Sequence, residues 1–195
     1  MQLRSDFDAI ANWVETNSSL LDLGCGDGSF LEFIRAKRKA ITYGVEITDT
    51  AVLACVEKGL NVIQQDLEGG LALFKDQSFD TVVLSQTLQT IHQTERILRE
   101  VVRVGKQCVV SFPNFGHWSH RYAVALGLMP VSKSLPYEWF NTPNVRVLTI
   151  ADFEALAHKL GIEILGRVVL HHGKTVHWLP NLFGSLAIYR VRGAK

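Results

Sequence analysis

Short apolar runs alternate with amphipathic helical segments through the first 112 residues of this chain. Short apolar runs are typical of buried strands, and apolar residues at helical spacing indicate helices packed on a sheet. Such an alternation favours a parallel sheet with helices on both faces. The expected strands are 19–23, 41–45, 61–65, 79–84 and 107–112, and the expected helices are 6–15, 29–36, 49–58 and 94–104.

The last 50 residues add one more helix and two more strands. Thr149 and Asp152 have the spacing of a capping box, with Asp in place of the usual Glu or Gln, and they predict a helix that ends at Leu160 before Gly161. Residues 162–170 and 186–192 look like strands. In open α/β sheets ligands bind beyond the carboxyl ends of the strands. We therefore examine the residues that follow each strand.

A glycine-rich turn follows the first strand, with the sequence Asp22-Leu23-Gly24-Cys25-Gly26-Asp27-Gly28. Glycines let the backbone turn tightly and approach a ligand closely. The dinucleotide fingerprint needs its third glycine at the position of Ser29, one residue later than here, which disfavours an NAD-dependent oxidoreductase. The pattern D-x-G-x-G-x-G resembles motif I of the S-adenosylmethionine (SAM)-dependent methyltransferases. The alternative is a tight strand-to-helix turn with no ligand.

Acidic residues end the next two strands. Glu46 lies 22 residues after Gly24, where an acid accepts hydrogen bonds from ribose hydroxyls. Asp66 ends the third strand and faces the adenine amino group in the methyltransferase pattern, in which Asp22 lies near the methionine end of the cofactor. Each acid alone is more often a solvated strand-end residue than a ligand. Together they disfavour a phosphate ligand and welcome a sulfonium. The predicted cofactor residues are Asp22, Gly24, Cys25, Gly26, Gly28, Glu46, Ile47, Asp66, Leu67 and Ser85.

The loop after the fourth strand, Ser85–Gln89, carries no recognised catalytic group. It lacks the Asn-Pro-Pro-Tyr of the amino-methylating DNA and glutamine enzymes and the Pro-Cys of the cytosine-C5 enzymes. Methyl transfer can rest on positioning of the acceptor, with or without a general base. The sequence thus predicts a cofactor cradle without naming a catalytic residue.

Segments spread along the chain closely resemble the MetW family of bacterial methionine-biosynthesis proteins. They are Leu20–Gly28, Val62–Leu67, Ser85–Gln89, Ser111–Trp118, Met129–Val131, Leu135–Tyr137 and Trp139–Asn144. The resemblance runs from Leu3 to Leu182 and is least clear at 174–179, so nothing functional is carried over there. It implies a Rossmann-like class I methyltransferase fold. That fold is a mostly parallel seven-stranded sheet with helices on both faces and an antiparallel C-terminal strand.

The resemblance also implies a function. It indicates a SAM-binding (or S-adenosylhomocysteine-binding), methyltransferase-like accessory factor that acts with homoserine O-acyltransferase in methionine synthesis. Because SAM is the end product of that pathway, we expect the cofactor to be an effector of acylation. The alternative is an autonomous SAM-dependent methyltransferase, a transferase with a small-molecule acceptor.

The region after the fifth strand has a composition of its own. Four of the five prolines and a disproportionate seven of the 18 aromatic residues lie between residues 107 and 148. We expect residues 1–195 to form a single domain in which 113–148 is an insertion, either a lid or a partner contact. The candidates for substrate or partner contact are Gln86, Asn114, His117 and Tyr137. His117 suits a base near neutral pH, although a loop histidine bonded to backbone is the favoured interpretation.

The charge balance, the cysteines and the histidines argue against several other kinds of function. The 20 Lys and Arg against 19 Asp and Glu argue against a nucleic-acid partner. Three cysteines without a CxxC pair, and no leader or membrane-length apolar run, indicate a cytoplasmic protein. We expect no metal site. His171 and His172 are adjacent on an expected strand and should point to opposite faces.

Overall fold

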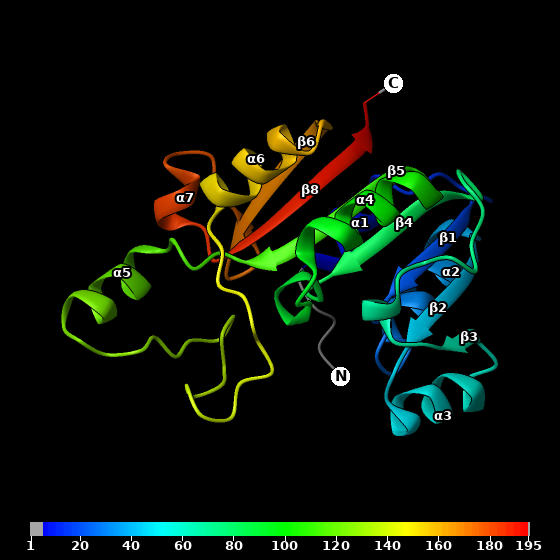
Figure 1. The fold of residues 1–195 in the computed structure, drawn as a ribbon, viewed down its shortest axis with the longest axis horizontal. Coiled ribbons are helices and arrows are strands. Elements are labelled where there is room, and N and C mark those ends of the chain that lie inside the picture. The colour runs from blue at the N-terminus through cyan, green and yellow to red at the C-terminus, as the bar shows by residue number, and fades with distance from the viewer. Residues whose placement is uncertain (1–5, 195) are drawn as a thin grey trace.

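The computed structural model describes residues 6–194. One eight-stranded sheet runs through the molecule in the order β3-β2-β1-β4-β5-β8-β6-β7 (Figure 1). Strands β1 to β5 are parallel, whereas β8 pairs antiparallel with both β5 and β6. The strands are β1 Ser19–Leu23, β2 Ile41–Glu46, β3 Asn61–Gln64, β4 Phe79–Ser85, β5 Gly105–Pro113, β6 Ile162–His171, β7 Lys174–Thr175 and β8 Leu186–Gly193.

The predicted α/β fold with a mostly parallel sheet is confirmed, but the strand count is wrong, since the sheet has eight strands. The additional strand, β7, is two residues long and pairs with the end of β6 through Leu170 and His171. A strand this short, with both residues exposed, has no apolar pattern for sequence analysis to detect.

Two apolar cores lie on opposite faces of the sheet. Neighbouring residues on one strand, such as Leu20 and Leu21, belong to different cores because side chains alternate along a strand. One face packs against α1, α2 and α3, and the other packs against α4 and α6. The helices are α1 Asp6–Ala11, α2 Ser29–Arg38, α3 Asp49–Glu57, α4 Thr94–Val104, α5 Trp118–Ala125, α6 Ile150–Lys159 and α7 Pro180–Phe183, with 3-10 turns η1 Leu67–Gly69 and η2 Leu88–Thr90.

The helix predictions hold except at three places: α1 is shorter than expected, and α5 and α7 have no predicted counterpart. The capping box is present, since Thr149 Oγ1 accepts from Asp152 N–H and Asp152 Oδ2 accepts from Thr149 N–H. The helix expected over 6–15 ends at Ala11, although Val14 remains buried because the turn that follows carries it into the core. Helix α5 was not predicted, because only His120 of its eight residues is buried and its apolar residues do not follow one face.

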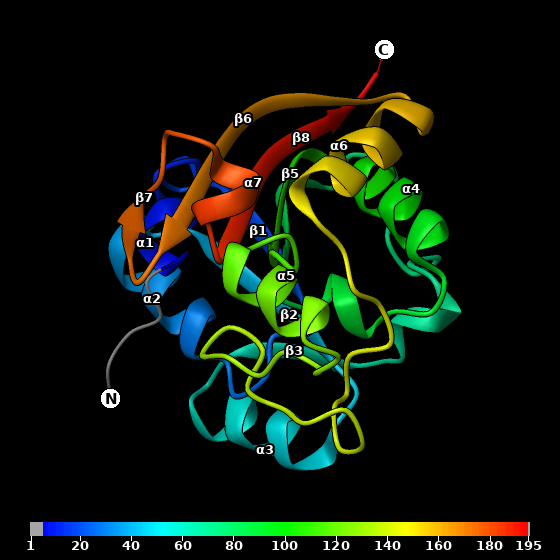
Figure 2. The same cartoon turned by 90° about the vertical axis from the view of Figure 1, so that its left-hand side faces the viewer.

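The chain between β5 and α6 extends beyond the carboxyl ends of β4 and β5 (Figures 1 and 2). From Leu126 to Thr149 it has no helix or strand. None of the helices within residues 6–194 is long and apolar enough to cross a membrane.

Candidate functional site

Strand order reverses between β1 and β4, so the carboxyl end of β1 lies at a topological switch point. All three glycines of the turn after β1 have a left-handed backbone, with φ of 76° at Gly24, 55° at Gly26 and 77° at Gly28. A Cβ on Gly24 would lie 2.7 Å from the Thr87 side chain, and one on Gly28 would lie 2.3 Å from Leu60. A Cβ on Gly26 would have no protein atom within 4 Å. Two glycines therefore permit close packing, whereas Gly26 borders open space.

Glu46 ties the end of β2 to this turn. Its Oε2 accepts from Gly26 N–H at 2.9 Å, and its Oε1 accepts from Ile47 N–H at 2.8 Å and Thr48 N–H at 3.0 Å. A carboxylate has about four lone-pair sites, so three backbone donors leave room for a ligand hydroxyl. Ile47 presents a side chain that is mostly exposed. These features fit a ribose and an adjoining apolar ring.

Two predicted cofactor residues, one just before the turn and one in it, are buried. Asp22 is buried on β1, and Cys25 is buried against Cys55, with the two Sγ atoms 3.9 Å apart. Burial, Asp22, Cys55 and Glu46 all raise the pKa of the Cys25 thiol far above its usual range. The thiol is therefore protonated at neutral pH and is a poor nucleophile.

Asp66 and Leu67 lie where β3 leads into η1. Asp66 is exposed and caps η1 by accepting from Glu68 N–H at 2.9 Å, whereas Leu67 is buried. Gln65 Nε2 donates to the Gly70 carbonyl at 2.7 Å. Since one Asp66 oxygen is engaged and the side chain is exposed, the other can accept from an amino group.

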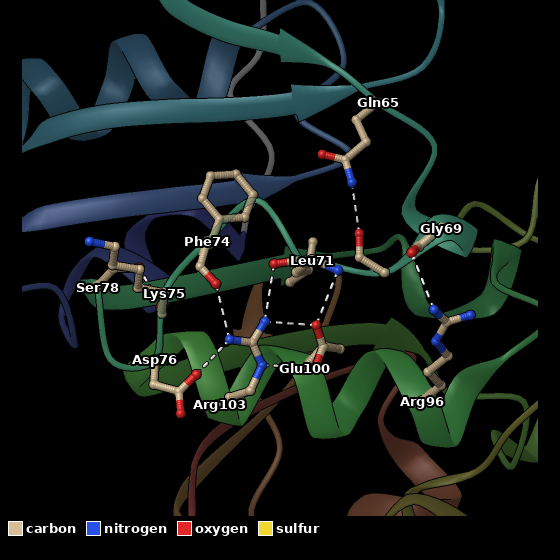
Figure 3. A network of polar contacts seen from close by, with 11 residues as sticks. Gln65, Gly69, Leu71, Phe74, Lys75, Asp76, Ser78, Arg96, Glu100 and Arg103 are labelled. Atoms are coloured by element: carbon tan, nitrogen blue, oxygen red, sulfur yellow. Dashed lines mark hydrogen bonds and ion pairs between the residues drawn. The ribbon is translucent and has the colours of Figure 1, made fainter.

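The chain that follows Asp66 is held against α4 by two arginines (Figure 3). Arg96 donates to the Gly69 carbonyl at 3.2 Å. Arg103 donates to the Leu71 and Phe74 carbonyls at 3.1 and 3.0 Å and pairs with Glu100 and Asp76. No sequence pattern points to these arginines, because the backbone carbonyls that they bind give no sequence signal.

At the end of β4, Ser85 is buried and its hydroxyl lies 3.3 Å from that of Ser111. Gln86 has a left-handed φ of 55°, a strained conformation for a residue other than glycine and one that is often found at functional sites. Its Nε2 donates to Asp6 Oδ2 at 3.1 Å. Asp6 is a buried residue on α1, and no local sequence pattern links it to Gln86, which is 80 residues away in the chain.

A cavity of about 1080 Å³ opens beside Gln86. Its wall comes from Asp6, the start of α5, the turn at 132–134, the turn after β6 and Ser185. His117, His171 and His172 all line it. Two predicted contact residues, Gln86 and His117, thus lie on one cavity, and this cavity adjoins the end of β4.

His117 caps α5, and its Nδ1 accepts from Ser119 N–H at 3.4 Å. This matches the interpretation of a histidine bonded to backbone. Burial, together with the neighbouring His171, His120 and His172, lowers the pKa of His117 to about 4. A general base works best with a pKa near the operating pH. His117 is therefore neutral at pH 7 and a weak base.

The expectation that His171 and His172 point apart is wrong. Their ring centroids lie 4.1 Å apart, and His171 stacks on His117 at 4.8 Å. His171 is the last residue of β6, and His172 has a left-handed φ of 47° in the turn beyond it, so strand alternation no longer applies. Even so, within residues 6–194 no group of three or more His, Cys, Asp or Glu side chains is placed to hold a metal ion.

Asn114 and Tyr137 lie away from the cavity. Asn114 is fully buried and its amide is taken up by backbone groups: Nδ2 donates to the Asn181 and Gly184 carbonyls, and Oδ1 accepts from Gly116 and Ile150 N–H. Tyr137 is exposed on the segment that follows α5. Asn114 thus joins three segments of the fold. Its amide is occupied by these backbone groups and does not face the cavity.

The histidine cluster predicts a loss of stability in weak acid. Because the pKa of His117 falls from 6.5 unfolded to about 4 folded, the unfolded chain binds the extra proton, and stability decreases as pH falls through this window. Between pH 7.5 and pH 5 we expect the titration of His117 to lower the free energy of unfolding by about 2 kcal/mol. Urea unfolding at both pH values measures it. In His117→Gln the pH-dependent loss should shrink by that amount, and an unchanged loss would contradict the assignment.

Comparison with known proteins decides the family. The family described as methionine biosynthesis protein MetW matches residues 4–191. The chain belongs to the MetW family. A bifunctional methionine biosynthesis protein MetXA/MetW of Rhodopirellula baltica is 37% identical over 172 residues, which cover 83% of this chain. The chain spans only 28% of the length of that relative.

Solved structures show the fold. A SAM-dependent methyltransferase of Mesorhizobium loti has a TM-score of 0.73 at 16% identity, covering 97% of this chain and 98% of its own. A SAM-dependent methyltransferase of Thermotoga maritima, described as a possible histamine N-methyltransferase, has a TM-score of 0.70 at 20% identity, covering 97% and 88%. At these identities the similarity establishes a class I methyltransferase fold for this MetW protein. The chemistry of the protein must be inferred from the residues of its site.

Proposed function

We propose that this methionine biosynthesis protein binds SAM and acts as an accessory factor of homoserine O-acyltransferase. The observation that carries the proposal is the relative in which MetXA and MetW form one polypeptide. Fusion keeps two proteins at high effective concentration, which is useful where they act together. The resemblance to the MetW family supports homoserine O-acyltransferase as that partner.

Several residues support SAM binding. Gly26 offers open space beside the backbone, Glu46 retains capacity for a ribose hydroxyl, and the exposed Asp66 carboxylate suits the adenine amino group. Asp22 is buried on β1, two residues before Gly24, and its negative charge favours a sulfonium. When bound, SAM supplies an activated methyl group, and as a pathway end product it also suits the role of effector.

An autonomous methyltransferase at this site would act by positioning its acceptor, without His117 or Cys25 as a general base. His117 has its pKa lowered to about 4, and Cys25 is protonated at neutral pH. Neither suits a general base at pH 7. One observation supports the alternative of an autonomous methyltransferase: the cavity beside Gln86 has room for a small acceptor.

The setting that we propose is a single domain, residues 1–195, in the cytoplasm. The two cores extend along the whole sheet, which supports one folding unit with 113–148 as an insertion. The three cysteines are free and buried, which suits a reducing compartment.

Measuring homoserine acyltransferase with and without this protein tests the proposal. We expect the acylation rate to change when the protein is added. We also expect SAM to shift the affinity of the pair by about 5- to 150-fold. Titration with SAM, S-adenosylhomocysteine and NAD serves as the binding control, with NAD expected to be silent. An acylation rate unchanged by the protein at every SAM concentration would refute the accessory role.

A further inference from the structure

Large apolar side chains are exposed mainly in one part of the molecule. Of the 20 that are exposed within residues 6–194, 12 lie between Trp118 and Val147. Trp139 is 74% exposed and Phe140 is 65% exposed. Large contiguous apolar patches are rare on monomeric proteins, and where they occur they mark interaction sites. We call the exposed side chains of residues 118–147 the insertion surface.

The segment that carries this surface has few anchors in the rest of the fold. Among the described residues, the hydrogen bonds of residues 126–144 are made either within the segment or to α5. One example of the second kind joins the Ser132 hydroxyl to His120 of α5. In Figures 1 and 2 the segment stands off the sheet as an extended loop. Loops of more than about 15 residues without regular structure are uncommon and are usually functional.

Basic residues outnumber acidic ones within the insertion surface. The charged residues between 118 and 147 are Arg121, Lys133, Glu138 and Arg146, all of them exposed, so three cations stand against one carboxylate. A groove of about 550 Å³ between α4 and α6 continues the surface at Arg146 and Val147. An apolar face that carries an excess of cations fits a partner with an apolar face that carries carboxylates.

We propose that the insertion surface is the docking site for homoserine O-acyltransferase, which meets it with an apolar patch that carries acidic residues. This inference rests on the proposed function for the identity of the partner. The MetXA/MetW relative supports that occupant, and the excess of basic residues specifies the charge of its surface. Aromatic residues at the centre of such an interface carry most of the binding energy.

The groove also connects the docking site to the cofactor loop. His92 and Gln93 line the groove, and their N–H groups donate to the Glu68 carboxylate, two residues beyond Asp66. Arg146 donates to the His92 carbonyl at 2.7 Å. A change at η1 on SAM binding thus has a short, hydrogen-bonded route to the partner surface.

The experiment measures binding of the purified acyltransferase by calorimetry for wild type and for Trp139→Ser combined with Phe140→Ser. We expect the partner Kd to rise at least about tenfold. Lys133→Glu should weaken binding most at low salt, because it reverses one of these basic charges. The matched control, Leu53→Ser with Leu73→Ser, removes two exposed apolar side chains elsewhere and should leave the Kd within about twofold. SAM affinity, unchanged in all variants, reports correct folding.

Each other outcome overturns the inference in a recognisable way. Wild-type binding with no effect of the double variant would refute the docking site and leave the proposed function standing. Absence of wild-type binding would refute both. Loss of SAM affinity with partner binding intact would show a lid. A change in self-association, seen by light scattering, with partner binding intact would show that a second copy occupies the surface.

Discussion

Replacing Gly26 by alanine should remove most of the SAM affinity while the protein stays folded. A Cβ at this position meets no protein atom within 4 Å, so the fold has space for it. It would project into the space that we assign to the cofactor, and the cofactor must approach the backbone there. We expect the Kd for SAM, measured by calorimetry, to rise by at least about tenfold, or 1.4 kcal/mol.

A matched glycine separates the ligand effect from the backbone effect. Gly26 has a φ of 55° and Gly161 a φ of 66°, and neither has a protein atom near its Cβ position. Alanine at either position should cost about 1–2 kcal/mol of folding stability, because a left-handed backbone is unfavourable for it. Gly161→Ala should keep the wild-type SAM affinity. Equal SAM affinity in the two variants would show that the cofactor does not approach Gly26.

Replacing Asn114 by alanine should strongly destabilise the fold. At a fully buried site, the change removes the side-chain partner of Gly116 N–H and of the Asn181 and Gly184 carbonyls, and one of the two acceptors of Ile150 N–H. Each buried polar group left unsatisfied costs about 1–3 kcal/mol. We expect a loss of about 3–5 kcal/mol in the free energy of unfolding, measured in urea.

The exposed Asn141 provides the control for Asn114. Its side chain makes one local hydrogen bond, to Glu138 N–H, so Asn141→Ala should change stability by less than about 1 kcal/mol. If Asn114→Ala unfolded like wild type but lost partner or ligand binding, Asn114 would return to the list of contact residues.

Much of the fold could be predicted from local patterns. The strand-helix alternation predicted β1 to β5 within two residues at each end, because apolar runs and capping signals are local. The glycine pattern likewise located the turn at the switch point. The segments between Ser111 and Asn144 indicated the family, which the match over residues 4–191 confirms.

The candidate site was only partly predictable. Asp6 reaches Gln86 from the far end of the chain, and His172 turns beside His171 because its backbone leaves the strand. Asn114 looked like a contact residue because it follows β5, yet four backbone groups occupy it. Such contacts depend on segments far apart in sequence, so no local pattern encodes them.

The sequence by itself determined the sheet, the glycine turn and the family, because period, capping and turn chemistry act between neighbouring residues. Only the tertiary structure decided which glycine borders open space, which histidines are neutral at pH 7 and which apolar side chains stay outside the core. The reason is physical. Exposure and pKa depend on everything that packs around a group, and that environment exists only once the chain has folded.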